Sequence, residues 1–152
     1  MEQATLLSSE ELAAWRGLLE AHAEVTRALD AQMRTEHGLP VSSYEVLMFL
    51  ADAPGHRLRM AEIAERVLLS RSGLTRLVDR MERDDLLRRR RCEEDQRGYF
   101  AEITDTGRAL FAQARRTHLD GVRERFLDRL SAQEQRTIAA LWEKVSPGAA
   151  GS

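Results

Sequence analysis

The sequence is poor in residues on which several classes of protein depend. It has one cysteine, Cys92, and three prolines in 152 residues, and a single cysteine excludes both an intramolecular disulfide and a CxxC metal framework. No apolar run approaches the ~20 residues needed to cross a bilayer. Residues 1–10 hold acids and serines where a signal peptide has a basic start and an apolar stretch. We therefore expect a cytoplasmic chain without a membrane partner.

The signatures of catalysis and of metal binding are missing as well. The histidines are scattered, and no HExxH, GxSxG or GxxxxGK motif occurs. A metal site needs clustered His, Cys or carboxylate ligands, whereas the acidic run Glu93–Asp95 is more simply a solvated turn. We expect no enzyme activity, no cofactor and no metal site.

What the chain does have is an ordinary globular composition with an uneven distribution of charge. Apolar residues make up 43% and charged residues 32% of the sequence, which indicates a chain that folds. Residues 57–97 carry 12 Arg and 9 Asp or Glu, a balance of +3 in a chain of net charge -2. The middle of the chain is therefore its basic part.

Helical periodicity and capping signals predict long helices near both ends of the chain. Ser8 and Glu11 have capping-box spacing, and the helix that follows continues to the break at Gly38. Thr104 is placed to cap a second long helix, which runs through Arg129. A further capping box at residues 131 and 134 precedes a last helix that ends near residue 145.

Shorter elements fill the middle. Ser42 and Glu45 have capping spacing before a short apolar helix, and two helices at about 60–67 and 70–81 are joined by a tight turn. Residues 88–91 and 99–103 then alternate as a two-stranded hairpin around a polar loop. This order predicts a mainly α fold with a small β-hairpin wing (α+β), which is a winged helix-turn-helix flanked by helices.

The helix at 70–81 has an apolar face and an outward polar face. The outward side chains are Arg71, Ser72, Thr75, Arg76, Asp79 and Arg80, with Ser70 as the expected cap. Such a helix fits the major groove of DNA, where Arg, Ser and Thr can bond base edges or phosphates. Taken by itself, the helix is equally well explained as a solvated amphipathic helix.

Two segments decide between these interpretations. The run Ile63-Ala64-Glu65-Arg66-Val67 through Ser70 to Glu82, and the run Asp95-Gln96-Arg97 through Thr104 to Gly107, resemble the MarR family of bacterial regulators. The second run has that family's pattern of Asp, any residue, Arg, then a strand, then Thr, two residues and Gly. The order of helices agrees with the family over nearly the whole chain.

The resemblance implies a DNA interface. Ser70, Arg71, Ser72, Thr75 and Arg76 would face the major groove, with Arg80 on the same side of the helix. Arg97 at the tip of the wing would enter the adjacent minor groove, whose negative potential attracts an inserted arginine. Asp95 would hold the wing in place; its alternative is a plain turn-forming residue.

The arginine run in the first strand of the wing alternates between two faces. Arg88 and Arg90 are expected to contact phosphates, while the other two arginines pair with Asp84, Asp85, Glu93 or Glu94. For any single member, a charged edge strand that discourages aggregation explains the pattern about as well.

The flanking helices predict a homodimer. Within a single domain at residues 1–152, residues of about 42–103 would form the DNA-binding lobe, and about 8–37 and 104–146 the dimerisation helices. A symmetric dimer would bind double-stranded DNA at a pseudo-palindromic operator and usually repress transcription there. The alternative is a winged-helix protein-interaction module without operator specificity. The apolar residues expected at the interface, with intrachain core as their alternative, are Leu6, Leu7, Leu12, Trp15, Leu130, Ile138, Leu141 and Trp142.

Regulation by a ligand is a further implication of the resemblance, since the family commonly binds small aromatic or phenolic acids. Trp15, His22, Tyr44 and Met48 would line the effector pocket, although such residues on apolar faces are more often core. Cys92 is expected to be a passive side chain of the wing strand, because the cysteine near the N-terminus that senses peroxide in some family members is missing.

Overall fold

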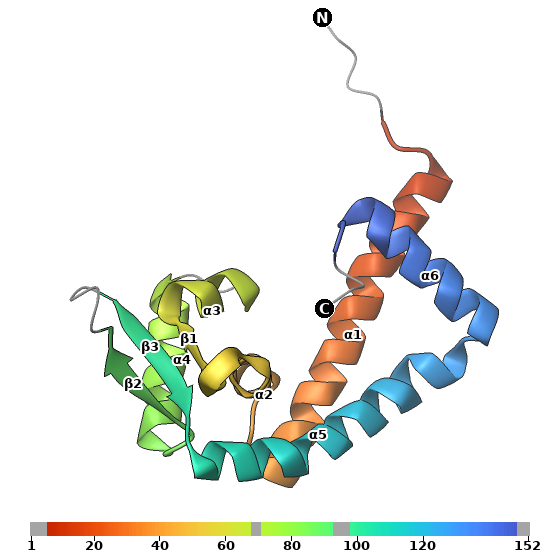
Figure 1. Cartoon of the computed structure of the whole chain (residues 1–152). Helices are drawn as coiled ribbons and strands as arrows, with labels where there is room; N and C mark the ends of the chain where they lie inside the picture. The colour runs from red at the N-terminus through yellow and green to blue at the C-terminus, as the bar shows by residue number, and fades with distance from the viewer. Residues whose placement is uncertain (1–5, 68–70, 93–97, 149–152) are drawn as a thin grey trace, which may run out of the picture. The chain divides into compact units, whose positions relative to one another are not determined.

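The computed structural model describes residues 6–67, 71–92 and 98–148. The chain forms helices α1 (Ser9–His37) and α2 (Val41–Asp52), strand β1 (Arg57–Arg59), and helices α3 (Met60–Arg66) and α4 (Arg71–Arg83). Strands β2 (Leu87–Arg91) and β3 (Tyr99–Ile103) and helices α5 (Asp105–Arg125) and α6 (Ala132–Val145) follow (Figure 1). Short 3₁₀ turns lie at Pro54–His56 and Leu127–Arg129. Within the described ranges, no helix has the length and apolarity to cross a membrane.

The chain divides into two compact units whose boundaries fall inside helices α1 and α5. One unit comprises residues 30–118, and the other comprises residues 1–29 together with 119–152. We call them the central unit and the terminal unit. The central unit contains the sheet, α2, α3 and α4, so its range includes the whole of the predicted DNA-binding lobe.

A three-stranded antiparallel sheet of order β1-β3-β2 organises the central unit. Cα pairing aligns Arg57 with Glu102 and Arg88, and Arg59 with Phe100 and Arg90. Leu58, Leu87, Ala101 and Ile103 point to the opposite face and are almost fully buried. One face of the sheet therefore belongs to the core, and the other carries mostly arginine.

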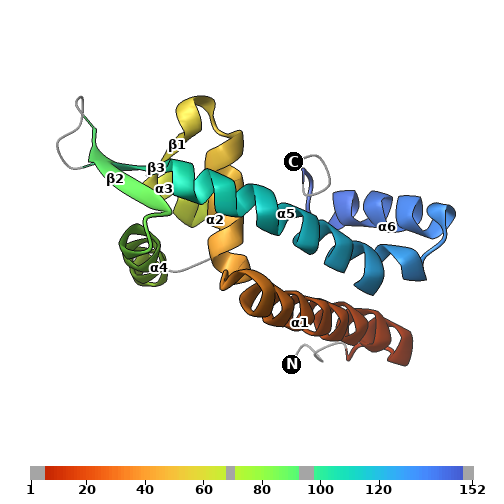
Figure 2. The ribbon, with the colours of Figure 1, turned by 90° about the horizontal axis from the view of Figure 1, so that it is seen from below.

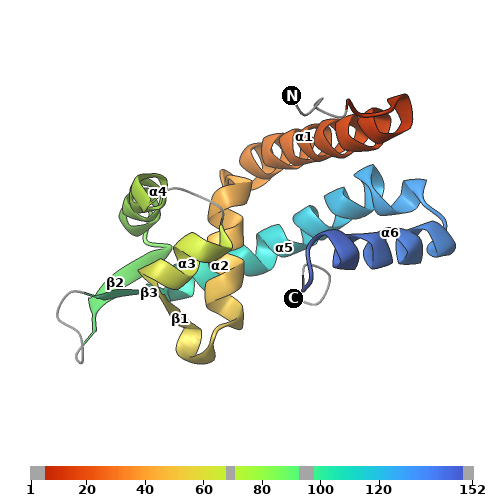
Figure 3. The same cartoon turned by 90° about the horizontal axis from the view of Figure 1, so that it is seen from above.

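Helices supply the rest of this core with their apolar faces. Met33 of α1 and Val46, Leu47 and Leu50 of α2 have no exposed surface, and Ile63 of α3 is equally buried. Helix α4 contributes Leu74, Leu77, Val78 and Met81 at the spacing of one helical face. The views in Figures 2 and 3 show α4 lying beside β2, in agreement with the contacts between these two elements.

Three predicted helix caps are confirmed. The Ser8 hydroxyl accepts from the Glu11 backbone N–H at 3.2 Å, and the Glu11 carboxylate accepts from the Ser8 N–H at 2.7 Å. Thr104 accepts from the Gly107 N–H at 2.9 Å at the start of α5. The capping box at the start of α6 is formed by Ser131 and Glu134. These caps are local, which is why spacing alone could predict them.

The cap predicted for α2 at Ser42 is wrong. Pro40 occupies the cap position and makes no side-chain hydrogen bond there. The Oδ1 atom of Asp30 on α1 accepts from the Val41 N–H at 2.9 Å. Burial raises the pKa of Asp30, but hydrogen bonds from Arg34 and Val41 outweigh it and hold this pKa below its ordinary value. A carboxylate from another helix thus does what Ser42 was expected to do.

Two boundaries also differ from the sequence prediction. Strand β1 was not predicted, because three residues cannot show a reliable alternation. Helix α5 ends at Arg125, and a 3₁₀ turn occupies Leu127–Arg129, where a continuous helix was expected. The side-chain amide of Gln135 donates to the Leu127 and Leu130 carbonyls at 3.0 and 3.1 Å, which stabilises this turn. The chain reverses direction there (Figure 3).

The terminal unit leaves much of its apolar surface exposed in one chain. Helix α1 presents Trp15 and Leu19, which are 54% and 49% exposed, and α6 presents Leu141 at 49%. Leu119, Phe126, Trp142 and Val145 are also exposed, by 37–72%. A single chain therefore does not cover the apolar faces of these helices.

Candidate nucleic-acid interface

Helix α4 presents polar side chains on the face opposite its buried residues. Ser72, Thr75, Arg76 and Arg80 are all exposed, and the Arg76 Nε donates to the Ser72 carbonyl at 3.4 Å. The backbone of Arg71 begins the helix, but its side chain and Ser70 lie outside the described part of the chain. The predicted division of this helix into an apolar and a polar face is confirmed for the described positions.

Strand β2 is attached to helix α4 by charged contacts. The Arg89 guanidinium donates to Asp79 and lies 3.5 Å from a carboxylate oxygen of Glu82. The other Glu82 oxygen accepts from the Arg89 backbone N–H at 3.0 Å, on the outer edge of the sheet. These contacts fix the axis of α4 relative to the wing. Sequence reasoning missed them, because it assigned the partners of this run to residues near it in the sequence.

The wing is a regular hairpin over its described part. Strands β2 and β3 pair from Leu87 with Ile103 to Arg91 with Tyr99, and the Cys92 N–H donates to the Gly98 carbonyl at 3.0 Å. The Arg91 guanidinium lies 6.0 Å from the centre of the Tyr99 ring. Cys92 is buried and free. Asp95 and Arg97 lie in residues 93–97, outside the described residues.

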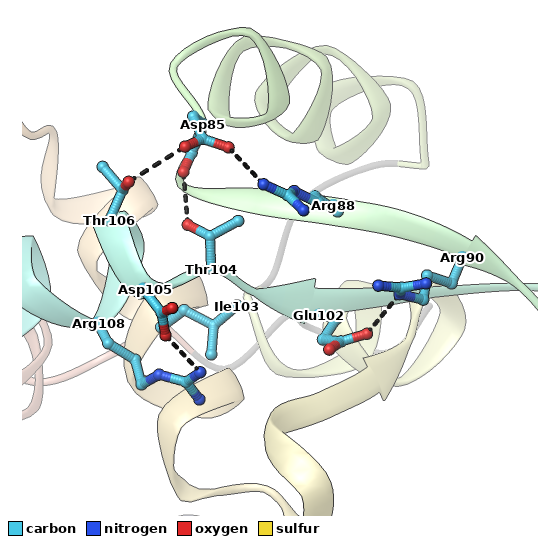
Figure 4. A pocket seen from close by; sticks show the side chains of 9 residues that line it. All are labelled: Asp85, Arg88, Arg90, Glu102, Ile103, Thr104, Asp105, Thr106 and Arg108. Atoms are coloured by element: carbon cyan, nitrogen blue, oxygen red, sulfur yellow. Dashed lines mark hydrogen bonds and ion pairs between the residues drawn. The ribbon is translucent and has the colours of Figure 1, made fainter.

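The base of the wing is held by a network around Asp85, a residue with a positive φ of 55°. The Thr104 hydroxyl donates to the Asp85 carbonyl, and the Thr106 hydroxyl donates to the Asp85 carboxylate at 3.1 Å (Figure 4). The ideal Cβ position of Gly107 is 2.0 Å from the Leu86 carbonyl oxygen. The Thr-x-x-Gly pattern recognised in the sequence therefore has a structural reason. The threonine bonds the base of the wing, and the glycine lets the start of α5 approach the wing backbone more closely than a side chain would allow.

Arg88 and Arg90 lie on the face of the sheet opposite Arg89. Arg88 is 3.4 Å from Asp85, which was expected to pair with Arg89 or Arg91 instead, and Arg90 is 2.8 Å from Glu102. Both side chains are 63% exposed. They line a polar hollow of about 370 Å³ with Glu102, Thr106 and Arg108 (Figure 4). The predicted alternation of the arginine run is confirmed.

The four residues predicted for an effector pocket are distributed over both units. Tyr44 is buried in the central unit, with its ring stacked 4.4 Å from the His118 ring and 5.4 Å from that of Phe111. Met48 is half-buried in the same unit, whereas Trp15 and His22 are exposed on the terminal unit. The polar hollow at the wing contains none of the four.

Burial shifts the pKa values of two groups in the aromatic cluster. It lowers the pKa of His118 and raises the pKa of Tyr44, so both groups favour their neutral forms. The Nδ1 atom of His118 is buried and has no hydrogen-bond partner among the described residues. Among all the residues that the structure describes, no group of three or more His, Cys, Asp or Glu side chains is arranged to hold a metal ion.

A short helix, a second helix with a polar outer face and a hairpin on a three-stranded sheet define a winged helix-turn-helix. The model of the MarR family matches residues 37–98. The repressor YetL of Bacillus subtilis is 31% identical over 112 residues, covering 72% of this chain and 67% of YetL. The chain therefore belongs to the MarR family of winged-helix regulators.

Solved structures agree over nearly the full length. One is the structure of Sco3205, a MarR family transcriptional regulator from Streptomyces coelicolor, in complex with DNA. It matches with a TM-score of 0.90 at 34% identity, and the match covers 97% of this chain and 92% of the Sco3205 chain. AbsC, a MarR family regulator from the same organism, has a TM-score of 0.87 at 30% identity, with coverage of 98% and 100%.

Proposed function

We propose that this protein is a homodimeric transcriptional regulator that binds a pseudo-palindromic DNA operator and represses the gene beside it. The observation that carries the proposal is the exposed row of Ser72, Thr75, Arg76 and Arg80 on a helix whose other face is fixed in the core. A helix with this division fits the major groove, where arginine can bond guanine at two points.

The relatives support this function. YetL is named a transcriptional repressor, and Sco3205 was solved in complex with DNA. We therefore place α4 of this chain in the major groove and Arg97 in the adjacent minor groove, with Asp95 supporting the wing. Ser70 and Arg71 belong to the same interface. We leave Arg88 and Arg90 out of it, because they lie on the sheet face opposite the residue that contacts α4.

The exposed apolar residues of the terminal unit support the homodimer. Trp15 and Leu19 of α1 and Leu141 and Trp142 of α6 are large apolar side chains that a single chain leaves exposed to water. A second copy of the chain would cover it, and a two-fold axis would place the two α4 helices on half-sites about 34–36 Å apart.

Release by a small aromatic or phenolic effector is part of the proposal. Such a ligand would act only by binding one spacing of the two α4 helices more tightly than the other. Tyr44 on α2 packs against Phe111 and His118 on helix α5, so the aromatic cluster of the central unit includes the helix that continues into the terminal unit.

A binding selection from a random duplex library at near-physiological salt tests the proposal, with the mass of the protein in solution measured alongside. A dimer should enrich one palindromic motif and prefer it over random duplex by ~10³-fold or more. A folded dimer that enriches no sequence would contradict the operator proposal and favour a protein-interaction module.

A further inference from the structure

The outer face of the sheet carries four arginines in two rows. The first row is Arg57, Glu102 and Arg88 across the three strands, and the second is Arg59, Phe100 and Arg90. We call these six residues the arginine face. All four arginines are exposed, and the face carries a net charge of +3 in a chain whose net charge is -2.

Packing on an aromatic ring organises one side of this face. The guanidinium carbons of Arg57 and Arg59 lie 5.0 and 5.4 Å from the centre of the Phe100 ring. The planar guanidinium of arginine combines stacking on an aromatic ring with paired N–H donors that match the two oxygens of a carboxylate. The ring, in turn, is already contacted by two cations and is a poor stacking platform for a nucleic-acid base.

The face lies away from the proposed operator interface. Arg89, whose side chain alternates with those of Arg88 and Arg90, contacts α4. Because side chains alternate across a strand, the arginine face and α4 are on opposite sides of β2. A duplex bound along α4 therefore leaves this face accessible.

The spacing of the arginines fits an extended peptide. Arg57 and Arg59, like Arg88 and Arg90, are two residues apart on a strand and thus about 6.6–6.8 Å apart along it. Alternate side chains of an extended acidic peptide repeat at the same distance. We propose that the arginine face binds an acidic, extended segment of a partner protein while α4 binds DNA.

Peptide binding tests this inference, with fluorescence anisotropy of a short labelled peptide of alternating Glu and Ser. We expect binding at low ionic strength to the free protein and equally to the operator-bound protein. Arg57→Glu/Arg59→Glu should weaken it about tenfold, because two favourable contacts become repulsive. The matched control is Arg27→Glu/Arg123→Glu, which makes the same charge change on exposed residues of α1 and α5. Because both residues lie in the terminal unit, sedimentation must first show that this control has the same mass in solution as the wild type; its peptide binding should then stay within about twofold of the wild type.

Further comparisons separate this surface from the operator interface and from other ligands. Operator affinity should change equally in the test and control variants. The inference is overturned if the wild-type protein does not bind the peptide, if both variants lose binding equally, or if the test variant loses operator affinity beyond the control. Tighter binding of a single-stranded oligonucleotide to the same arginines would also overturn it.

If Arg57→Glu/Arg59→Glu does not fold, Arg88→Glu/Arg90→Glu on the other edge strand replaces it. Peptide binding is measured on the free protein as well, so the arginine face can be tested even if no operator is found.

Discussion

Arg89 of strand β2 and Asp79 of helix α4 form an ion pair that joins the wing to this helix. The two residues are ten positions apart and come from elements that the core places side by side. The Arg89 side chain is 28% exposed, so solvent screens this pair less than the pairs on the outer face. The contact sets how α4 and the wing would approach DNA together.

Replacing Arg89 should therefore affect stability and DNA binding together. We expect Arg89→Met to lower the free energy of unfolding by about 1 kcal/mol and to weaken operator binding, because α4 is less firmly oriented. Urea unfolding and operator titration measure the two effects. Arg88→Met is the control, since Arg88 is 63% exposed and should change stability by less than ~0.5 kcal/mol. Equal losses in both variants would contradict a specific role for Arg89.

Gly107 should not tolerate a side chain. A Cβ atom there would lie 2.0 Å from the Leu86 carbonyl oxygen, so Gly107→Ala must displace backbone and should cost at least ~2 kcal/mol of stability. Gly17 in α1 has no atom within 4 Å of its ideal Cβ position, and Gly17→Ala should stabilise the helix by about 0.5–1 kcal/mol. Thermal unfolding of both variants measures the contrast. A mild effect at Gly107 would mean that α5 and the wing separate easily.

Arg76 should read a base through two hydrogen bonds. Arg76→Ala should then cost ~1–3 kcal/mol of operator affinity and relax the preference at one base pair. Arg76→Lys keeps the charge but loses the paired donors, so it should relax the same preference with a smaller loss of affinity. Affinities for the selected operator and for single-base variants at fixed salt measure this. An unchanged preference in both variants would assign Arg76 to the phosphates.

Leu141 should lie in the dimer interface. Because it is 49% exposed in the single chain, Leu141→Glu should leave the fold of one chain intact and place a charge in the buried interface. Sedimentation should show a shift from dimer to monomer, with loss of operator binding. Lys144→Glu on the same helix, at an exposed polar position, is the control and should remain a dimer. A dimeric Leu141→Glu variant would place the interface elsewhere.

His118 should make stability depend on pH. Burial lowers its pKa in the folded state, whereas the unfolded chain has the ordinary value of about 6.5. Below that value the unfolded state binds more protons, so stability falls as the pH falls toward the folded pKa and then levels off. His118→Phe keeps an aromatic ring beside Tyr44 and should flatten this part of the profile. Urea unfolding at several pH values checks it, and an unchanged slope would assign the dependence to another group.

Local patterns in the sequence were sufficient for most of the fold and for the described part of α4. The buried residues Leu74, Leu77, Val78 and Met81 follow the helical period, so Ser72, Thr75 and Arg76 had to face outward. Capping boxes at Ser8 and Ser131 and the cap at Thr104 depend on residues three positions apart, and spacing alone could find them. The periodicity of a helix or strand is a property of the chain itself.

Side-chain contacts between different helices and strands were decided only by the tertiary structure. Asp30 caps α2 from another helix, and Arg89 pairs with α4 instead of with the adjacent acids. Strand β1, too short to be predicted, completes the arginine face by placing Arg57 and Arg59 over Phe100. The sequence by itself determined which side chains face outward from each element, because that depends on local periodicity. Which of those side chains meet depends on how the core packs the elements together, and no local pattern contains that information.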